Sequence, residues 1–298
     1  MGDHAEAEEM QPVLHLGNGR YQQLPDEWGA VAHRVFPLVC LNAGEFSGLG
    51  TAWLLAYAGD SMILATAEHV VSAAANAPAP QIFASIPMRP EETRSVTHRS
   101  LVPLGAIGTV NSFSDVALLR ADINRAADPI LHRPAQLPID IGKPVVGERC
   151  LVFGYTRIAV TPQKPGVVLI DSPLHAAQGT ITEVHPRSRS TALMYSFPCF
   201  ETDAFVDHGL SGGPAISERG DVIGVVSACL PDVERTHFGT TRCALAATLA
   251  GPGVSMPDGT EVKLSRLAAE GRIAGCGVTA SHEVRDDGAL VTWLDEPN

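Results

Sequence analysis

Basic residues are scarce in this sequence, and their scarcity limits the partners that the chain can bind. The 298 residues include 21 Lys and Arg against 33 Asp and Glu, which gives a net charge of -12. Because binding to phosphate groups needs a basic surface, this balance argues against nucleic acid as the partner. Aromatic residues are also few, at 5%, but an apolar content of 45% with 18% charged residues is that of a globular protein.

Long apolar segments are absent as well. A membrane span needs about 20 apolar residues, and the longest candidate, 244–254, is interrupted by Gly251, Pro252 and Gly253. The first twenty residues contain acidic side chains and no apolar segment of the kind that secretory signals carry. We therefore expect a soluble, cytoplasmic protein that does not bind a membrane.

Paired cysteines are the third absence. The six cysteines are scattered, and no Cys-x-x-Cys pair occurs, so neither a zinc site nor a disulfide framework is indicated. Cys40 and Cys150 lie within apolar runs, where a cysteine usually behaves as a small buried apolar residue. We expect reduced thiols, as in the cytoplasm, and neither a metal ion nor a cofactor.

Short apolar runs bounded by Gly, Pro, Asn or Asp make up most of the chain, which is typical of β-sandwiches and β-barrels. A first set of runs and a second set are separated by a proline-containing stretch, 133–144. The pattern predicts an all-β protein with two six-stranded antiparallel β-barrels, although it also fits a pair of β-sandwiches. The expected strands are 35–41, 50–57, 61–65, 81–86, 101–107 and 116–120, then 149–155, 167–170, 179–184, 192–197, 213–216, 222–226 and 241–249.

This pattern suggests four parts. Residues 1–34 form an N-terminal extension, 35–140 the first β-barrel, 141–250 the second β-barrel, and 251–298 a C-terminal helix and hairpin. The clearest helical pattern is 260–273, where Val262, Leu264 and Leu267 fall near one face.

The strongest local motif is the glycine-rich segment 209–214, Gly-Leu-Ser-Gly-Gly-Pro. Glycines on both sides of Ser211 allow a tight turn that presents one hydroxyl together with exposed backbone N–H groups. A serine needs an adjacent base to become nucleophilic, and the oxyanion that then forms needs hydrogen-bond donors aimed at it. The N–H groups of Gly209 and Ser211 are the candidates for this oxyanion hole, although the motif alone also fits an ordinary glycine turn.

Two further residues complete a candidate catalytic set. His69 follows the apolar strand 61–65, and Asp115 opens the apolar strand 116–120. Each alone also fits a structural role, but a base must be placed rigidly and a carboxylate can orient it. The order His, Asp, Ser is that of chymotrypsin, with separations of 46 and 96 residues (115 − 69 and 211 − 115). His69 and Asp115 therefore fall in the first barrel and Ser211 in the second, which places the site between the barrels.

These motifs resemble those of a known family. Residues 65–70 resemble the Thr-Ala-Ala-His-Cys segment of trypsin-like peptidases, and 115–119 resemble their Asp-Ile-Ala-Leu-Leu strand. Residues 202–214 are similar to the Thr-Asp-Ala-Ala-Ile-Asn-Pro-Gly-Asn-Ser-Gly-Gly-Pro block of bacterial HtrA-type peptidases. The resemblance covers about residues 35–250 and implies a chymotrypsin-like double barrel with serine endopeptidase activity.

The departures from this family are informative. Trypsin-type zymogens have an aspartate just before the nucleophile, which pairs with a newly cut N-terminus, but Leu210 stands there in this chain. We therefore do not expect activation by an inserted N-terminal amine. Val70 replaces the disulfide-forming cysteine of secreted trypsins, and the chain after residue 250 is too short for the peptide-binding domain of HtrA proteins.

The family's layout also implies where the substrate binds. No acidic residue falls on the implied pocket floor, so specificity for Arg or Lys is not expected, and a small or medium apolar residue is preferred. A contact of His208 with the substrate near the oxyanion hole is one alternative, but we expect His208 to be a solvated loop residue. The implied pocket residues are Phe205, Val206, Ser227, Ala228, Cys229 and the strand 243–246.

We interpret the chain as a serine endopeptidase that acts on one or a few intracellular proteins, under the control of a regulatory protein partner or of its own terminal segments. Two alternatives remain open at this stage. One is a latent or inactive protease-fold binding module, and the other is an acyl hydrolase or esterase that uses the same three residues.

Overall fold

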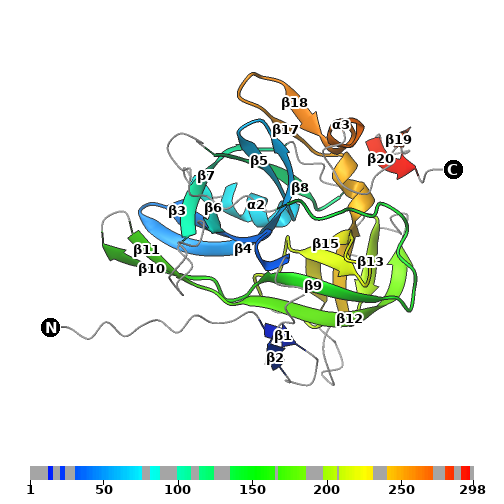
Figure 1. Cartoon of the computed structure of the whole chain (residues 1–298), viewed down its shortest axis with the longest axis horizontal. Helices are drawn as coiled ribbons and strands as arrows, with labels where there is room; N and C mark the ends of the chain where they lie inside the picture. The colour runs from blue at the N-terminus through cyan, green and yellow to red at the C-terminus, as the bar shows by residue number, and fades with distance from the viewer. Residues whose placement is uncertain are drawn as a thin grey trace.

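The computed structural model describes residues 13–15, 21–23, 31–75, 81–87, 99–108, 114–123, 135–164, 167–185, 197–206, 208–230, 240–270, 279–284 and 290–295. Figure 1 shows two β-barrels side by side, with a short C-terminal region packed over one end of the pair.

The first barrel is closed by six antiparallel strands in the order β3-β4-β5-β8-β7-β6. Alternate residues point to opposite faces of a strand, and in β5 both faces are buried. In β5, Met62 and Leu64 belong to the cluster inside the barrel, whereas Ile63 and Ala65 face a second cluster outside it. The strands are β3 (Val35–Asn42), β4 (Glu45–Ala58), β5 (Ser61–Thr66), β6 (Gln81–Pro87), β7 (Arg99–Ile107) and β8 (Ala117–Asp122).

The second barrel is also a six-stranded antiparallel ring, and one long strand closes it. The N-terminal part of β12 (Leu174–His185) pairs with β9, whereas its C-terminal part pairs with β13. The other neighbours are β13–β16, β16–β15, β15–β14 and β14–β9. These strands are β9 (Arg149–Tyr155), β13 (Cys199–Thr202), β14 (Pro214–Ser217), β15 (Val222–Leu230) and β16 (Thr240–Leu245).

The two barrels share one apolar core. Trp53 of the first barrel and Phe153 of the second, both without exposed surface, belong to the same buried cluster. The C-terminal region adds to this core through Leu264 and Leu267 of α3 (Leu264–Ala269). Burial of this size fixes the barrels relative to each other, and with them any site that uses residues from both.

The fold confirms the predicted class, two six-stranded antiparallel barrels of the chymotrypsin-like type. Several smaller predictions were wrong in their bounds. The strand expected at 241–249 ends at Leu245, because the 3-10 helix η1 (Ala246–Ala250) follows it. The helix expected at 260–273 starts only at Leu264, because β18 (Glu261–Lys263) pairs with β17 (Gly253–Ser255).

Other segments differ from the expected strands more strongly. The segment 167–170 forms a strand, β11 (Val167–Asp171), but it pairs with β10 (Ala159–Lys164) in a separate hairpin outside the barrel. In the expected strand 192–197, only residue 197 is described, and it precedes β13. The proposed domain bounds stay a prediction.

Terminal segments pack on this double barrel. In the N-terminal extension, β1 (Val13–His15) pairs in parallel with β12 and antiparallel with β2 (Tyr21–Gln23). Near the C-terminus, β19 (Thr279–Val284) and β20 (Leu290–Asp295) form the expected hairpin. Within the described residues, no helix has the length and apolar character that crossing a membrane requires.

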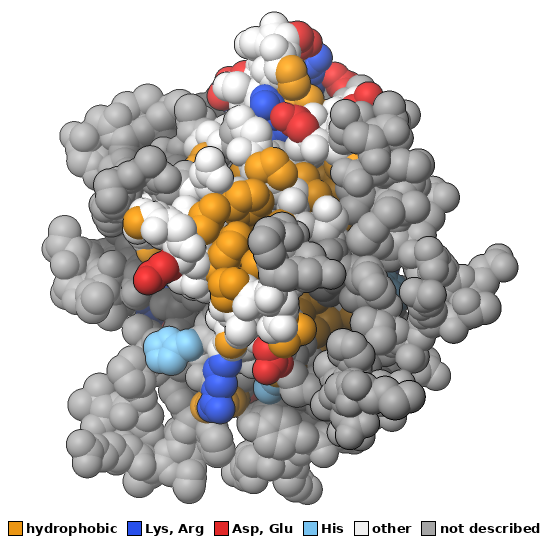
Figure 2. All heavy atoms as spheres, turned by 90° about the vertical axis from the view of Figure 1, so that its left-hand side faces the viewer, with side chains coloured by type: hydrophobic (Ala, Val, Ile, Leu, Met, Phe, Trp, Pro, Cys, Tyr) orange, Lys and Arg blue, Asp and Glu red, His pale blue; other side chains and the backbone are white. Residues whose placement is uncertain are grey.

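The hairpin β10–β11 projects at the left of Figure 1. Figure 2 looks onto this side of the molecule and shows apolar side chains gathered in a band across its centre. Leu169 of the hairpin is 46% exposed, which is unusual for a large apolar side chain in the described residues.

Candidate active site

The structure brings His69 and Asp115 together at the edge of the first barrel. His69 lies in the first turn of α2 (Glu68–Ala75), directly after β5, and its Nδ1 is 3.0 Å from both carboxylate oxygens of Asp115. The Asp115 side chain is 9% exposed and that of His69 is 47% exposed. The imidazole is therefore held at Nδ1 by a buried carboxylate, while the ring remains open to solvent.

The backbone explains why Asp115 can hold this position. Its φ of 45° is in the left-handed region, which Asp tolerates better than most residues. Oδ1 also accepts the backbone N–H of His69 at 3.0 Å, and the Asp115 carbonyl accepts the N–H of Glu68 at 3.2 Å. The first N–H groups of a helix have no partner within the helix, so Asp115 caps α2 and orients its histidine at once.

Four influences set the pKa of His69. Burial lowers it, but the hydrogen bond and the charge of Asp115, together with the charge of Glu68, raise it more, so that the pKa lies above the ordinary value of histidine. The ring is thus easier to protonate than a free imidazole, as a proton acceptor requires.

Ser211 lies at the boundary between the barrels, on a turn that requires glycine at positions 209 and 212. Gly209 has φ 104°, and a Cβ there would lie 2.4 Å from the carbonyl oxygen of Tyr155. Gly212 has φ 88°, and a Cβ there would lie 2.1 Å from the carbonyl oxygen of Thr51. Such contacts are too close for any side chain, so the glycine pattern of the sequence is a steric requirement of this packing.

Ser227 of β15 joins Ser211 to Asp115. Its hydroxyl donates to Oδ2 of Asp115, and its carbonyl accepts the Ser211 hydroxyl at 3.4 Å. Within the described part of the chain, Ser211 Oγ has this partner and no hydrogen bond to His69. Hydrogen bonds of this kind are often unformed without substrate, and a rotation of the serine side chain changes the partner of its hydroxyl.

The predicted oxyanion donors lie on the same turn. Among the described residues, no protein group accepts the N–H of Gly209 or of Ser211. The carbonyls beside these N–H groups are bonded: His208 O accepts from the Arg157 N–H at 3.3 Å, and Leu210 O accepts from the Gly213 N–H at 2.9 Å.

A comparison with protein-family models identifies this arrangement. The model described as "Trypsin-like peptidase domain" matches residues 50–225, which is more than half of the chain and contains all three predicted catalytic residues. The chain belongs to the trypsin-like peptidase family. A comparison with curated proteins gives no match.

Solved structures with a similar fold include bacterial proteases. The active form of the Rv3671c protease from M. tuberculosis is 18% identical, with a TM-score of 0.50 over 89% of this chain and 92% of that one. An inactive form of Rv3671c is 20% identical (TM-score 0.47; 75% and 89% covered). The HtrA-type protease AlgW, solved with a tripeptide, is 18% identical (TM-score 0.48; 74% and 58% covered). At such identities the likeness concerns the fold.

The predicted pocket residues of this trypsin-like domain are described only in part. Val206 is buried within the second barrel, and Phe205 is half-buried. Ala228 and Cys229 lie on β15, opposite Arg242 and Thr241 of β16, but their side chains lie outside the described residues. The pocket lining therefore stays a prediction.

Two features of the site were not predicted. The first is the bond between the Ser227 side chain and Asp115, since Ser227 was assigned only to substrate binding. The second is Thr51 of β4, which is fully buried and bonds the turn around Ser211. The sequence offered a signal for Thr51, a hydroxyl residue between Gly50 and Ala52 at the start of the expected strand 50–57.

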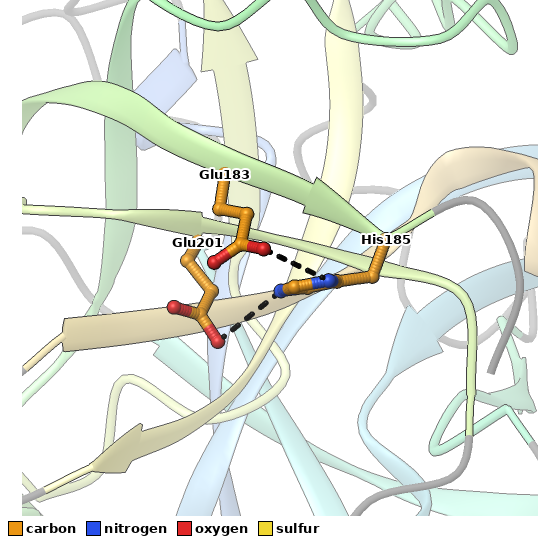
Figure 3. Close-up of side chains that lie close together, drawn as sticks. All are labelled: Glu183, His185 and Glu201. Carbon is orange, nitrogen blue, oxygen red and sulfur yellow. Dashed lines mark ion pairs between the residues drawn. The ribbon is translucent and has the colours of Figure 1, made fainter. Parts of the chain in front are cut away.

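A separate polar cluster lies on the second barrel, on a single face of β12 and β13 (Figure 3). His185 lies between two carboxylates, with Nδ1 3.6 Å from Glu183 and Nε2 3.5 Å from Glu201. These three residues place ligand atoms close enough to hold a metal ion. However, Glu201 is already paired with the buried guanidinium of Arg242 at 2.5 Å, so the cluster also forms an ion-pair network without a metal.

Proposed function

We propose that this trypsin-like domain is a serine endopeptidase, in which Ser211 is the nucleophile, His69 the general base and Asp115 the residue that orients the base. The observation that carries the proposal is the buried Asp115 carboxylate, which holds Nδ1 of His69 at 3.0 Å next to the glycine turn of Ser211. A carboxylate in this position fixes the tautomer with the proton on Nδ1, which leaves Nε2 free to accept a proton.

The proposed reaction follows from this tautomer. As Ser211 Oγ attacks the peptide carbonyl, its proton passes to Nε2 of His69, and the positive imidazolium is stabilised by Asp115. His69 then gives this proton to the leaving amine, and an acyl-enzyme remains on Ser211. A water molecule, deprotonated by His69, hydrolyses that ester and regenerates the serine.

We assign the stabilisation of the negatively charged oxygen in the tetrahedral intermediate to the N–H groups of Gly209 and Ser211. Peptide groups are planar, so each N–H points away from the carbonyl of its own peptide group. Because the carbonyls of His208 and Leu210 are bonded on the far side, the two N–H groups are directed away from those contacts. Preorganised donors of this kind usually contribute a large part of the rate enhancement.

A peptide is the substrate that β15 favours. β14 pairs with β15 only up to Val225, and within the described residues no strand pairs with Ser227 on that side. An extended peptide can add to such a strand edge through main-chain hydrogen bonds. We propose a protein substrate cut after a small or medium apolar residue, because no acidic side chain is assigned to the pocket.

Restricted activity is part of the proposal. A peptidase of the cytoplasm, the location that the sequence favours, would damage its own cell unless its activity were limited. The pairing of β1 with β12 supports a role for the N-terminal extension, because it attaches this segment to the second barrel. A regulatory protein partner that binds this segment would supply the control.

Labelling with a fluorophosphonate tests the activity. We expect wild-type protein to be labelled at Ser211, the Ser211→Ala variant not at all, and the His69→Ala variant at least 100-fold more slowly. Ser217→Ala, in β14, serves as the control and should be labelled like wild type. Folded wild-type protein that is not labelled would instead support a latent binding module.

Mapping of newly formed protein N-termini separates the peptidase from the esterase alternative. Cell extracts treated with wild type are compared with extracts treated with Ser211→Ala. Cleavage at one or a few sites by the wild type alone would identify the substrate. Hydrolysis of simple esters with no new N-termini would contradict the assignment as an endopeptidase.

A further inference from the structure

Thr51 connects the first barrel to the turn that carries the proposed nucleophile. Thr51 is fully buried in β4, on the opposite side of the barrel boundary from Ser211. Its side-chain hydroxyl donates to the carbonyl of Gly209 at 2.8 Å and accepts the N–H of Tyr155 at 2.9 Å. Its backbone N–H donates to the carbonyl of Ser211 at 2.9 Å.

These bonds complete a series along the turn. The carbonyls of four successive residues, 208 to 211, are each bonded by an N–H or O–H group, and Thr51 supplies two of the four donors. Arg157 and Gly213 supply the others. Since a carbonyl and the N–H of the same peptide group point in opposite directions, Arg157 and Gly213 orient the peptide groups that carry the N–H of Gly209 and of Ser211. Thr51 holds the peptide group between these two and the one that follows them, so it limits how the two N–H groups can turn relative to each other.

The hydroxyl of Thr51 is chemically suited to this place. It lies between a backbone donor of the second barrel, Tyr155 N–H, and a backbone acceptor of the turn, Gly209 C=O. A hydroxyl can donate and accept at the same time, whereas a methyl group of the same size can do neither. Removing it would leave the buried Tyr155 N–H and the partly buried Gly209 carbonyl without this partner, and buried polar groups rarely stay unpaired.

Thr51 is itself held in place. Its carbonyl accepts the hydroxyl of Thr66 at 2.6 Å, and Thr66 is the last residue of β5, before the helix of His69. The strand that presents the base and the turn that presents the nucleophile are therefore both bonded to Thr51.

We infer that Thr51 is a positioning residue that sets the oxyanion-binding geometry of Gly209 and Ser211 from the neighbouring barrel. The inference rests on the proposed function. Thr51 acts through the backbone of the turn and does not contact the reacting atoms.

Three variants test this role. Thr51→Val removes the hydroxyl and keeps the shape, Thr51→Ser keeps the hydroxyl, and Thr248→Val is the matched control. Thr248, in η1, is also buried, and its hydroxyl donates to the carbonyl of Leu245 at 2.7 Å. Peptide hydrolysis is measured well below the unfolding temperature of each variant.

We expect Thr51→Val to lower kcat by about 10- to 100-fold with little change in KM, because oxyanion donors act in the transition state and their direct loss costs about 100- to 1,000-fold. Thr51→Ser should recover most of the rate, and Thr248→Val should match wild type. The pH profile of Thr51→Val should keep the acid limb of wild type, because the pair of His69 and Asp115 is untouched. A Thr51→Val enzyme with wild-type kcat would overturn the inference.

Hydrogen exchange measured by mass spectrometry gives a second readout that does not need activity. We expect Thr51→Val, but not Thr248→Val, to speed deuterium uptake in the peptide that contains residues 208–213. Unchanged uptake in this peptide would overturn the inference even in an inactive protein. If wild type is not labelled by the fluorophosphonate but Thr51→Val still loosens the turn, the proposed function fails and the structural role of Thr51 stands.

Discussion

At the scale of single residues, the pair of His69 and Asp115 depends on backbone contacts as much as on side chains. Asp115 binds the imidazole and also accepts a backbone N–H at the start of α2, so the His69 ring and its helix are oriented by a single carboxylate. The motif pattern in the sequence indicated the pairing. It did not indicate this cap, because α2 was not predicted, nor the left-handed backbone at Asp115, because a backbone angle of a non-glycine residue leaves little trace in a sequence.

Glu68 offers a test of the electrostatics at this scale. His69 must be neutral to act as a base, so kcat/KM should rise as the pH increases through its raised pKa. Glu68→Gln removes one of the charges that raise this pKa, and we expect the acid limb of the profile to move to lower pH. The measurement is kcat/KM against pH at low salt.

The control for this prediction is Glu218→Gln, which removes a carboxylate from the surface of the second barrel, where Glu218 pairs with Arg149. A limb that moves equally in both variants would show a general charge effect instead of an influence of Glu68 on His69.

At the scale of elements, strands that are buried on both faces were predicted well. The runs 61–65 and 149–155 match β5 and β9 closely, because these strands are apolar and end at polar residues or turns. The prediction failed where a segment with helical periodicity pairs with a distant strand instead. Val262 fits a helical face, but it lies in β18 opposite Val254, and a short-range pattern cannot show such a partner.

The cluster in Figure 3 places Glu201 of β13 beside His185 of β12. Glu201 is also bonded to Arg242 of β16, so the full network joins three strands of the second barrel. Arg242 is 3% exposed. We expect Arg242→Met to lower the free energy of unfolding by about 3 kcal/mol, because removing one partner of a buried pair leaves the other charge uncompensated. Urea unfolding measures this difference.

Arg149→Met is the matched control for this prediction. Arg149 also pairs with a carboxylate, Glu218, but both side chains are about half exposed or more, at 63% and 49%. Exposed ion pairs contribute little to stability, so we expect Arg149→Met to lower the free energy of unfolding by about 0.5 kcal/mol. Equal losses in the two variants would contradict the view that burial makes the network of Arg242 important.

At the scale of the whole molecule, the placement of the three residues followed from their order in the sequence, whereas the packing that joins the barrels did not. Thr51, Tyr155 and Gly209 come from distant parts of the chain and meet only through the shared core. No local pattern contains such a contact, so the sequence alone indicated the three candidate catalytic residues but not the contacts that align them.

The mode of activation can be tested on the whole chain. Leu210, at the position before Ser211, is 1% exposed within the core of the second barrel. An apolar side chain there cannot form an ion pair with an inserted N-terminal amine. We therefore expect Nα-acetylated protein and protein with a free N-terminus to be labelled by a fluorophosphonate at the same rate. A rate that falls at least tenfold on acetylation would show that the free amine takes part in activation.

The division of the site between the barrels also bears on how the protein is made. Asp115 receives its second side-chain partner from Ser227, which is synthesised 112 residues later, and the turn of Ser211 is held by Thr51 from the other end of the chain. A growing polypeptide that has completed only its first barrel carries the proposed base, His69, without the proposed nucleophile, Ser211. Under the proposed mechanism, cleavage therefore becomes feasible only once the second barrel has closed.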